Sequence, residues 1–235
     1  ADWSGARTAG EDVATLIGSA MDGAGALRWV DGWLRLTPAQ RENVRLLGVD
    51  DAMALARTQH CAYAITGRLV AHGDSADVFL EMYDVRGDSL ISRTTRTTAG
   101  VQESWRAGLS DVTQLLPQLL GGTPPNVERE WRSRPPQAVA HFLRGEAAFR
   151  RVQLPTALAA FRQAIDADST FGLAAERGAQ VASWMHDNAE AEALVHVALR
   201  QNLPPRHQHF ARGFEAFLRG RTDARLATAF VCSMV

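Results

Sequence analysis

Few residues in this sequence could do chemistry, and the most conspicuous are two histidines. His207 and His209 flank Gln208, directly after two prolines. A zinc site needs three or four ligands, and a spacing of two residues at a helix start directs the rings to different faces. The sequence therefore argues against a metal site at these histidines, and we expect neither a metal nor a cofactor.

Three other short groups suggest chemistry but fit ordinary structure better. His60 and Cys61 could form a base and a nucleophile, yet neighbouring residues entering a strand point to opposite faces. Asp50 and Asp51 could form an acid pair, yet carboxylates at a helix start usually cap the helix and complement its dipole. Arg86-Gly-Asp88 matches an adhesion tripeptide, yet Gly-Asp is also common turn chemistry between strands. We therefore expect no catalytic residue among them.

The complete absence of lysine excludes several enzyme classes. All 25 basic residues are arginine. The chain therefore has no Schiff-base lysine, no phosphate-loop lysine and no kinase nucleotide-binding lysine. It also lacks the G-x-S-x-G, H-E-x-x-H and Cys-x-x-Cys motifs. We expect a protein that is not an enzyme, and the open alternative is an enzyme with a scattered site between its domains.

The composition is that of a globular protein. Of 235 residues, 46% are hydrophobic and 22% are charged, and the formal net charge of −1 indicates no footprint for nucleic acid. No apolar run approaches the roughly 20 residues that span a bilayer. Because the first residue is Ala rather than Met, we expect a processed or truncated chain, and an upstream signal or anchor stays open. Cys61 and Cys232 are far apart, so a disulfide between them is neither predicted nor excluded.

Hydrophobic periodicity predicts an amino-terminal α+β domain over residues 1–121. Helical and alternating patterns are separated there by turn residues such as His72-Gly-Asp74. Three alternating stretches follow one another closely, which predicts an antiparallel meander. The predicted elements are a helix at 11–21, a short strand at 27–30, helices at 37–48 and 50–59, strands at 62–71, 78–83 and 89–98, and a long helix at 101–119.

A proline-rich segment at 122–136 is the predicted boundary of that domain. Four of the nine prolines lie in it and frame a charged stretch that contains Trp131. This composition indicates a semi-rigid linker. An aromatic residue in such a linker either pins the two domains together or anchors a partner, and we expect the first.

The carboxyl-terminal part, residues 137–235, repeats itself. The segments His141 to Phe149 and His209 to Phe217 share six of nine residue types and begin 68 residues apart. That distance is twice the 34-residue period of tetratricopeptide repeats, and Gly145, Ala179 and Gly213 mark the single period. The part therefore resembles tetratricopeptide repeats, with two complete units and one partial unit. The resemblance implies antiparallel helix pairs that bury their apolar faces by stacking.

The amino-terminal domain carries a second resemblance. Its core reads Tyr63-Ala-Ile-Thr-Gly-Arg-Leu-Val70, then Gly73-Asp74, then Val78-Phe-Leu-Glu-Met-Tyr-Asp84. These stretches are similar to the core of bacterial TolB-amino-terminal-like domains, over about Glu11 to Gly121. The opening strand of that family would lie before Asp2. The resemblance implies a periplasmic location, since such domains often precede tetratricopeptide repeats in the extracytoplasmic parts of receptors and related regulators.

Stacked helix pairs form a concave surface that suits an extended or helical peptide. The lysine clamp that some tetratricopeptide repeats use for carboxyl-terminal peptides is excluded, because the chain has no lysine. Projected from the repeat family, the groove-facing residues are Glu146, Arg150, Glu176, Gln180, Trp184, His207 and Phe214.

We therefore expect a non-catalytic protein–protein interaction module, an α+β domain joined to a short array of helix pairs. The short array favours an accessory or scaffolding subunit that docks onto a membrane-associated complex. The main alternative is the extracytoplasmic, ligand-sensing portion of a larger receptor. A small-ligand sensor with a pocket in the α+β layer is a further class. The expected partner is a protein, with no nucleic acid and no membrane span in this chain.

Overall fold

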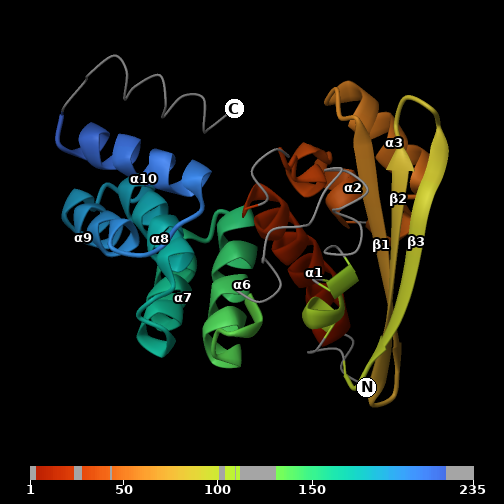
Figure 1. The fold of residues 1–235 in the computed structure, drawn as a ribbon, viewed down its shortest axis with the longest axis horizontal. Helices are drawn as coiled ribbons and strands as arrows, with labels where there is room; N and C mark the ends of the chain where they lie inside the picture. Colours follow the sequence, from red (N-terminus) through yellow and green to blue (C-terminus); the bar gives the residue numbers. More distant parts are fainter. Residues whose placement is uncertain are drawn as a thin grey trace. The chain divides into compact units, whose positions relative to one another are not determined.

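The chain folds into two compact units, Ala1–Glu128 and Arg129–Val235 (Figure 1). In this computed structural model the described residues are 4–23, 28–42, 44–100, 104–108, 110–111 and 131–220. The first unit contains helices and a sheet, and the described part of the second is entirely helical. This layout confirms the predicted order of an α+β region followed by a helical region.

Three antiparallel strands form the sheet of the first unit, in the order β1-β2-β3. Gly73, with a φ of 57°, makes the first turn, and Asp88, with a φ of 51°, lies in the second. In the second turn the Asp84 carboxylate accepts hydrogen bonds from the backbone amides of Arg86 and Gly87. The predicted meander is confirmed, and its strands are β1 at Tyr63–His72, β2 at Ser75–Asp84 and β3 at Ser89–Thr98.

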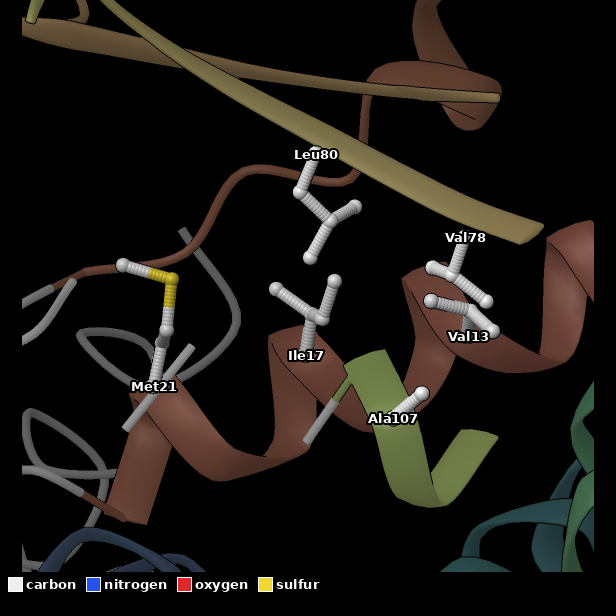
Figure 2. Close-up of a cluster of buried hydrophobic side chains, with 6 residues drawn as sticks. All are labelled: Val13, Ile17, Met21, Val78, Leu80 and Ala107. Carbon is white, nitrogen blue, oxygen red and sulfur yellow. The ribbon is translucent and has the colours of Figure 1, made fainter. Parts of the chain in front are cut away.

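A buried apolar cluster joins this sheet to α1, which spans Ser4–Gly23 and is longer than the predicted helix. Residues four apart on α1 face alternate residues of β2, as the periods of a helix and a strand require. The helical residues 104–108 add an alanine to the same layer. The cluster consists of Val13, Ile17, Met21, Val78, Leu80 and Ala107 (Figure 2).

The helix predicted at 37–48 is wrong in its length. α2 ends after one turn, at Pro38–Glu42, and a separate 3-10 turn, η2, follows at Val44–Leu46. The start is as predicted. The Thr37 hydroxyl accepts a hydrogen bond from the backbone amide of Gln40, and the side-chain oxygen of Gln40 accepts one from the backbone amide of Thr37. Arg41 donates to two carbonyls of the preceding turn η1, Gly32–Arg35, so a tertiary contact fixes this short helix.

The helix predicted at 50–59 is confirmed as α3, Val49–Thr58. The Asp51 carboxylate accepts the Gly48 amide proton at 2.9 Å, so this acid acts as a helix cap, as predicted. α3 buries Met53 and Ala56 against Ala64 of β1. The predicted structural role of the aspartate pair therefore holds for Asp51.

The strand predicted at 27–30 is wrong for residues 28–30, which form no regular element. The indole of Trp29 lies against α1 where Gly18 leaves room, and a Cβ at Gly18 would collide with that ring. The segment therefore follows the surface of a helix rather than a sheet edge. Of the long helix predicted at 101–119, residues 104–108 and 110–111 are helical, and the remainder lies outside the described residues.

In the second unit, five successive helices pack each against the next. Prolines occupy the first turns of three of them, where a missing amide proton costs nothing. The helices are α6 at Pro136–Arg150, α7 at Leu154–Ala167, α8 at Gly172–Trp184, α9 at Asn188–Leu199 and α10 at Pro205–Leu218.

α6, α8 and α10 end in the same way. Two residues after each helix the backbone turns left-handed, at Val152 (φ 58°), His186 (φ 62°) and Gly220 (φ 67°), which are 34 residues apart. After α6 and α8 the next amide donates to a carbonyl five residues back, a Schellman motif. These bonds run from Gln153 to Ala148 and from Asp187 to Ala182, each at 2.9 Å. The period seen in the sequence therefore recurs in the backbone.

Four aromatic rings form the centre of the helical unit. Phe142, Phe161 and Phe171 are almost fully buried, and Trp131 is 5% exposed. The Phe142 ring lies 5.0 Å from Phe171, 5.6 Å from Trp131 and 5.8 Å from Phe161, between centroids. Such pairs add roughly 0.5–1.5 kcal/mol beyond their buried area. The rings come from α6, α7, the start of α8 and the segment before α6, so they join successive helices.

The prediction that Trp131 sits in a linker between domains is therefore corrected, since its ring belongs to the core of the helical unit. The residues after it are also held there: the Arg134 guanidinium lies 4.3 Å from the Phe171 ring centroid. It donates to the Asp168 carboxylate at 2.8 Å. Residues 131–136 of the predicted linker are thus packed on this unit, and 122–130 lie outside the described residues.

Asp168 is a largely buried anion at the end of α7, and its side chain is 10% exposed. Burial raises the pKa of this carboxyl group. Hydrogen bonds from the hydroxyl and amide of Thr170 and from Arg134 lower it by more, so the Asp168 pKa lies below its ordinary value. The ionised form therefore stabilises the fold.

The approach of α7 to α6 gives a first prediction. A Cβ built on Gly145 would lie 2.6 Å from the Phe161 ring. Gly145→Ala should therefore lower the free energy of unfolding by about 1–3 kcal/mol, measured by urea denaturation. Gly10→Ala in α1 is the matched control, because a Cβ there meets nothing within 4 Å. Gly10→Ala should raise the free energy of unfolding by roughly 0.5–1 kcal/mol. An equal decrease in both variants would contradict the steric account.

Asp168 gives a second prediction, in the pH dependence of stability. Because its folded pKa is depressed, its contribution is fully present above the unfolded pKa, about 3.9, and is lost as the pH falls through the folded value. Asp168→Asn should lower the free energy of unfolding by about 1–3 kcal/mol at neutral pH. The difference from the unchanged protein should shrink as the pH falls. Denaturation of both proteins across acidic pH measures this. A deficit that stays constant to the lowest pH would contradict it.

Candidate functional site

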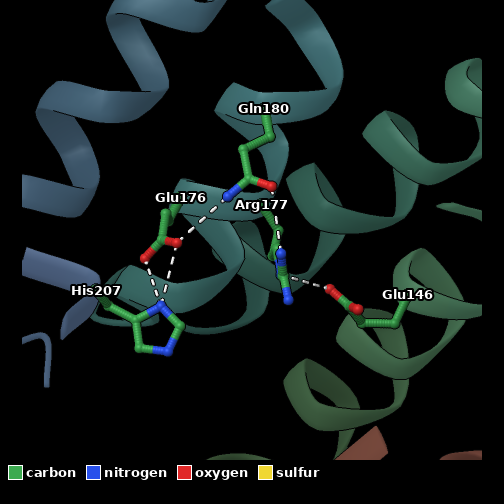
Figure 3. Close-up of polar contacts among 5 residues, drawn as sticks. All are labelled: Glu146, Glu176, Arg177, Gln180 and His207. Atoms are coloured by element: carbon green, nitrogen blue, oxygen red, sulfur yellow. Dashed lines mark hydrogen bonds and ion pairs between the residues drawn. The ribbon is translucent and has the colours of Figure 1, made fainter. Parts of the chain in front are cut away.

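An ion pair connects the first helices of neighbouring pairs in the helical unit. The Arg177 Nε of α8 lies 3.0 Å from the Glu146 Oε1 of α6 (Figure 3). Glu146 is 6% exposed, and the Arg177 side chain is 30% exposed. A carboxylate this deeply buried needs a cation beside it, because desolvation would otherwise favour its neutral form. The pair therefore fixes how α6 and α8 sit against each other.

A second buried pair joins α8 to α10. The His207 Nδ1 lies 3.0 and 3.1 Å from the two carboxylate oxygens of Glu176. A hydrogen bond from this ring to an ionised carboxylate requires the proton to lie on Nδ1. Glu176 is 2% exposed and His207 8% exposed, and the pair lies within the array. His207 therefore has a structural role, holding α10 against α8.

Gln180 links these two pairs into one network. Its side-chain amide donates to the Glu176 carboxylate at 3.3 Å, and its carbonyl oxygen accepts from Arg177 at 3.2 Å. The spacing of three and four residues brings these groups to one face of α8. The polar network, Glu146, Glu176, Arg177, Gln180 and His207, thus spans three helices (Figure 3).

The predicted groove residues fall into two groups. The structure brings Glu146, Glu176, Gln180 and His207 together, but three of these four are buried. Phe214 is 4% exposed and stacks on Phe210 and Phe217 of its own helix.

The expectation that Glu146, Glu176, His207 and Phe214 face an open groove is therefore corrected. Glu146, Glu176 and His207 form ion pairs that connect α6, α8 and α10, and Phe214 is buried within the array. These four residues keep at most 8% of their surface exposed. Whether the remaining residues bind a partner stays a prediction.

The three predicted residues that retain exposed surface are Arg150, Gln180 and Trp184. Trp184, at the last position of α8, is 59% exposed. Its ring lies 5.0 Å from that of Phe149 on α6, with the planes inclined by 36°. A large, half-exposed aromatic surface therefore extends from α8 to α6.

Arg177 is the member of the polar network that the sequence did not predict. It was passed over because the projected groove positions follow a fixed pattern, and Arg177 lies one residue after such a position. Its charge was a usable signal. Arg177 is the basic residue of α8 and directly follows Glu176, and α6 carries a second acid, Glu146. Two stacked helices with buried acids require such a cation.

The other candidates from the sequence lie where ordinary structure explains them. His209 is exposed while His207 is buried, so the two rings occupy different faces of α10, as predicted. Cys61 is a free thiol that lies 3.8 Å from the Gln59 carbonyl oxygen, and Cys232 is outside the described residues. Asp88, in the β2–β3 turn, forms an ion pair with Arg57 of α3 at 2.5 Å. Across the described residues, no three His, Cys, Asp or Glu side chains are grouped to hold a metal ion.

No protein-family model, curated protein or solved structure matches this chain. Among the helices that the structure describes, none combines the length and the apolar character needed to cross a membrane.

The polar network gives a third prediction, in the form of a double-mutant cycle. Glu146→Gln and Arg177→Met should each destabilise the protein, and the double variant should lose less than the sum of the two. We expect a coupling energy of about 1–3 kcal/mol in urea unfolding, because the pair is largely removed from water.

The exposed pair between Arg162 and Glu190 is the matched control for this cycle. Its atoms are closer, at 2.7 Å, but the Arg162 side chain is 51% exposed. Its coupling should stay below about 1 kcal/mol, because water screens the charges. A coupling at Glu146–Arg177 no larger than this control would show that burial adds nothing to the network.

Proposed function

We propose that this chain is a non-catalytic protein–protein interaction module that docks as an accessory or scaffolding subunit onto another protein. The observation that carries the proposal is the 34-residue recurrence of the left-handed turns at Val152, His186 and Gly220. A backbone period of this length supports tetratricopeptide-like helix pairs, which present side chains from successive units along one surface.

The buried polar network supports the same proposal. Its groups are engaged with one another between α6, α8 and α10, so they stiffen the array rather than offer a reactive side chain. A stiff array loses little conformational freedom when a partner binds, which favours affinity. We therefore assign the unit a role in presenting surface rather than in chemistry.

We further propose that the partner belongs to a membrane-associated complex and that the chain works outside the cytoplasm. This part rests on the resemblance of the β1–β2 region to TolB-amino-terminal-like domains. The observed meander, with its tight turns at Gly73 and Asp88, is compatible with that resemblance.

Affinity capture of the full chain from solubilised membranes of its source organism tests the proposal. A subunit should recover one protein at a fixed stoichiometry, measured by quantitative mass spectrometry after mild cross-linking. Phe142→Asp is the control bait, because an unpaired charge at the fully buried centre of the helical unit should prevent its folding. A chain that stays monomeric and recovers nothing beyond that control would contradict the proposal.

A further inference from the structure

The end of the array where α6 and α8 terminate carries an exposed apolar surface. Trp184 is 59% exposed and stacks on Phe149, so the two rings form one continuous surface across the helices. In the turns that follow, Val152 is 71% exposed and Met185 is 38% exposed. We call these residues, Phe149, Val152, Trp184 and Met185, the aromatic ledge.

Two arginines and one aspartate lie next to the residues of the aromatic ledge in the sequence. Within residues 149–153 and 183–187 the charged residues are Arg150, Arg151 and Asp187. The Asp187 carboxylate already accepts the Glu190 amide proton at 3.1 Å, as the cap of α9. The two arginines lie at the carboxyl-terminal end of α6, where the helix dipole stabilises positive charge. Two arginines therefore lie beside Phe149 and Val152 in the sequence.

We propose that the aromatic ledge is a docking site for an acidic protein segment with aromatic or aliphatic anchor side chains. This inference rests on the proposed interaction function and names the chemistry of the partner. The anchors would cover the Trp184 and Phe149 rings, while Asp or Glu residues beside them would face Arg150 and Arg151. Tryptophan and arginine are the residue types in which binding energy concentrates at protein interfaces.

Two features of the structure favour the ledge over the face between α6, α8 and α10. The acids of that face, Glu146 and Glu176, are buried and already paired with Arg177 and His207. The ledge, in contrast, keeps its apolar area in water. Stacking on Phe149 also holds the Trp184 ring in place, so less rotamer entropy is lost when a partner covers it.

Binding of short synthetic peptides to the full chain tests the proposal. The probe is a fluorescein-labelled peptide in which Trp and Leu alternate with Asp and Glu, followed by fluorescence anisotropy. Trp184→Ala should weaken its binding roughly tenfold or more, as for an interface hot spot. Arg150→Glu should weaken it by a further severalfold and reduce its dependence on salt, because the charge across the interface is reversed.

Matched controls separate the ledge from general stickiness. Arg144→Glu reverses an exposed arginine elsewhere on α6, and Leu46→Ala removes an 81% exposed side chain from the first unit. Both variants should bind the acidic peptide as the unchanged chain does. A peptide with Lys and Arg in place of the acids should bind more weakly, and so should one with Ser in place of the anchors.

The proposal is overturned if the unchanged chain does not bind the acidic peptide or if the control variants lose binding equally. It is also overturned if a single-stranded oligonucleotide or vesicles of anionic lipid bind in place of the peptide and depend on Trp184. A partner recovered from membranes equally well by the unchanged chain and by Trp184→Ala would leave the interaction function standing and remove the ledge from it. Loss of that recovery in Trp184→Ala alone would support both.

Discussion

The contact between Phe161 and Gly145 is the one on which the helical unit depends. The Phe161 ring occupies the space that a side chain on α6 would otherwise fill, so α7 lies close against α6. From there the ring reaches Phe142, which in turn meets Trp131 and Phe171. One missing Cβ thus allows an aromatic core to connect the segment before α6 with the start of α8.

The packing of successive helices also explains why charged residues lie inside the array. Acids that this packing removes from water must find partners nearby. Glu146 and Glu176 do so with Arg177 and His207. Exposed apolar surface then remains where helices end and packing stops, as at Trp184. Helix packing therefore decides which side chains of the array are buried and which stay exposed.

The sequence carried the features that depend on local pattern. Strand alternation located the first and third strands to within one residue and the core of the second, which begins three residues earlier than predicted. The 34-residue spacing located the helix pairs. It failed where distant contacts decide the structure. The segment at 28–30 follows α1 because Trp29 finds Gly18, and Trp131 joins a core whose other rings are at least eleven residues away. In the candidate site, spacing found four members of the polar network but could report neither their burial nor the part of Arg177.

The left-handed turns have a consequence for how the array could be lengthened. Val152 and His186 occupy the same place in successive units, with the same pattern of backbone bonds around them. A second copy of residues 153–186, inserted after His186, would begin and end at left-handed turns of the kind that the chain already forms. The array is therefore modular at the level of its backbone, and its reach can change by whole units without any new turn being invented.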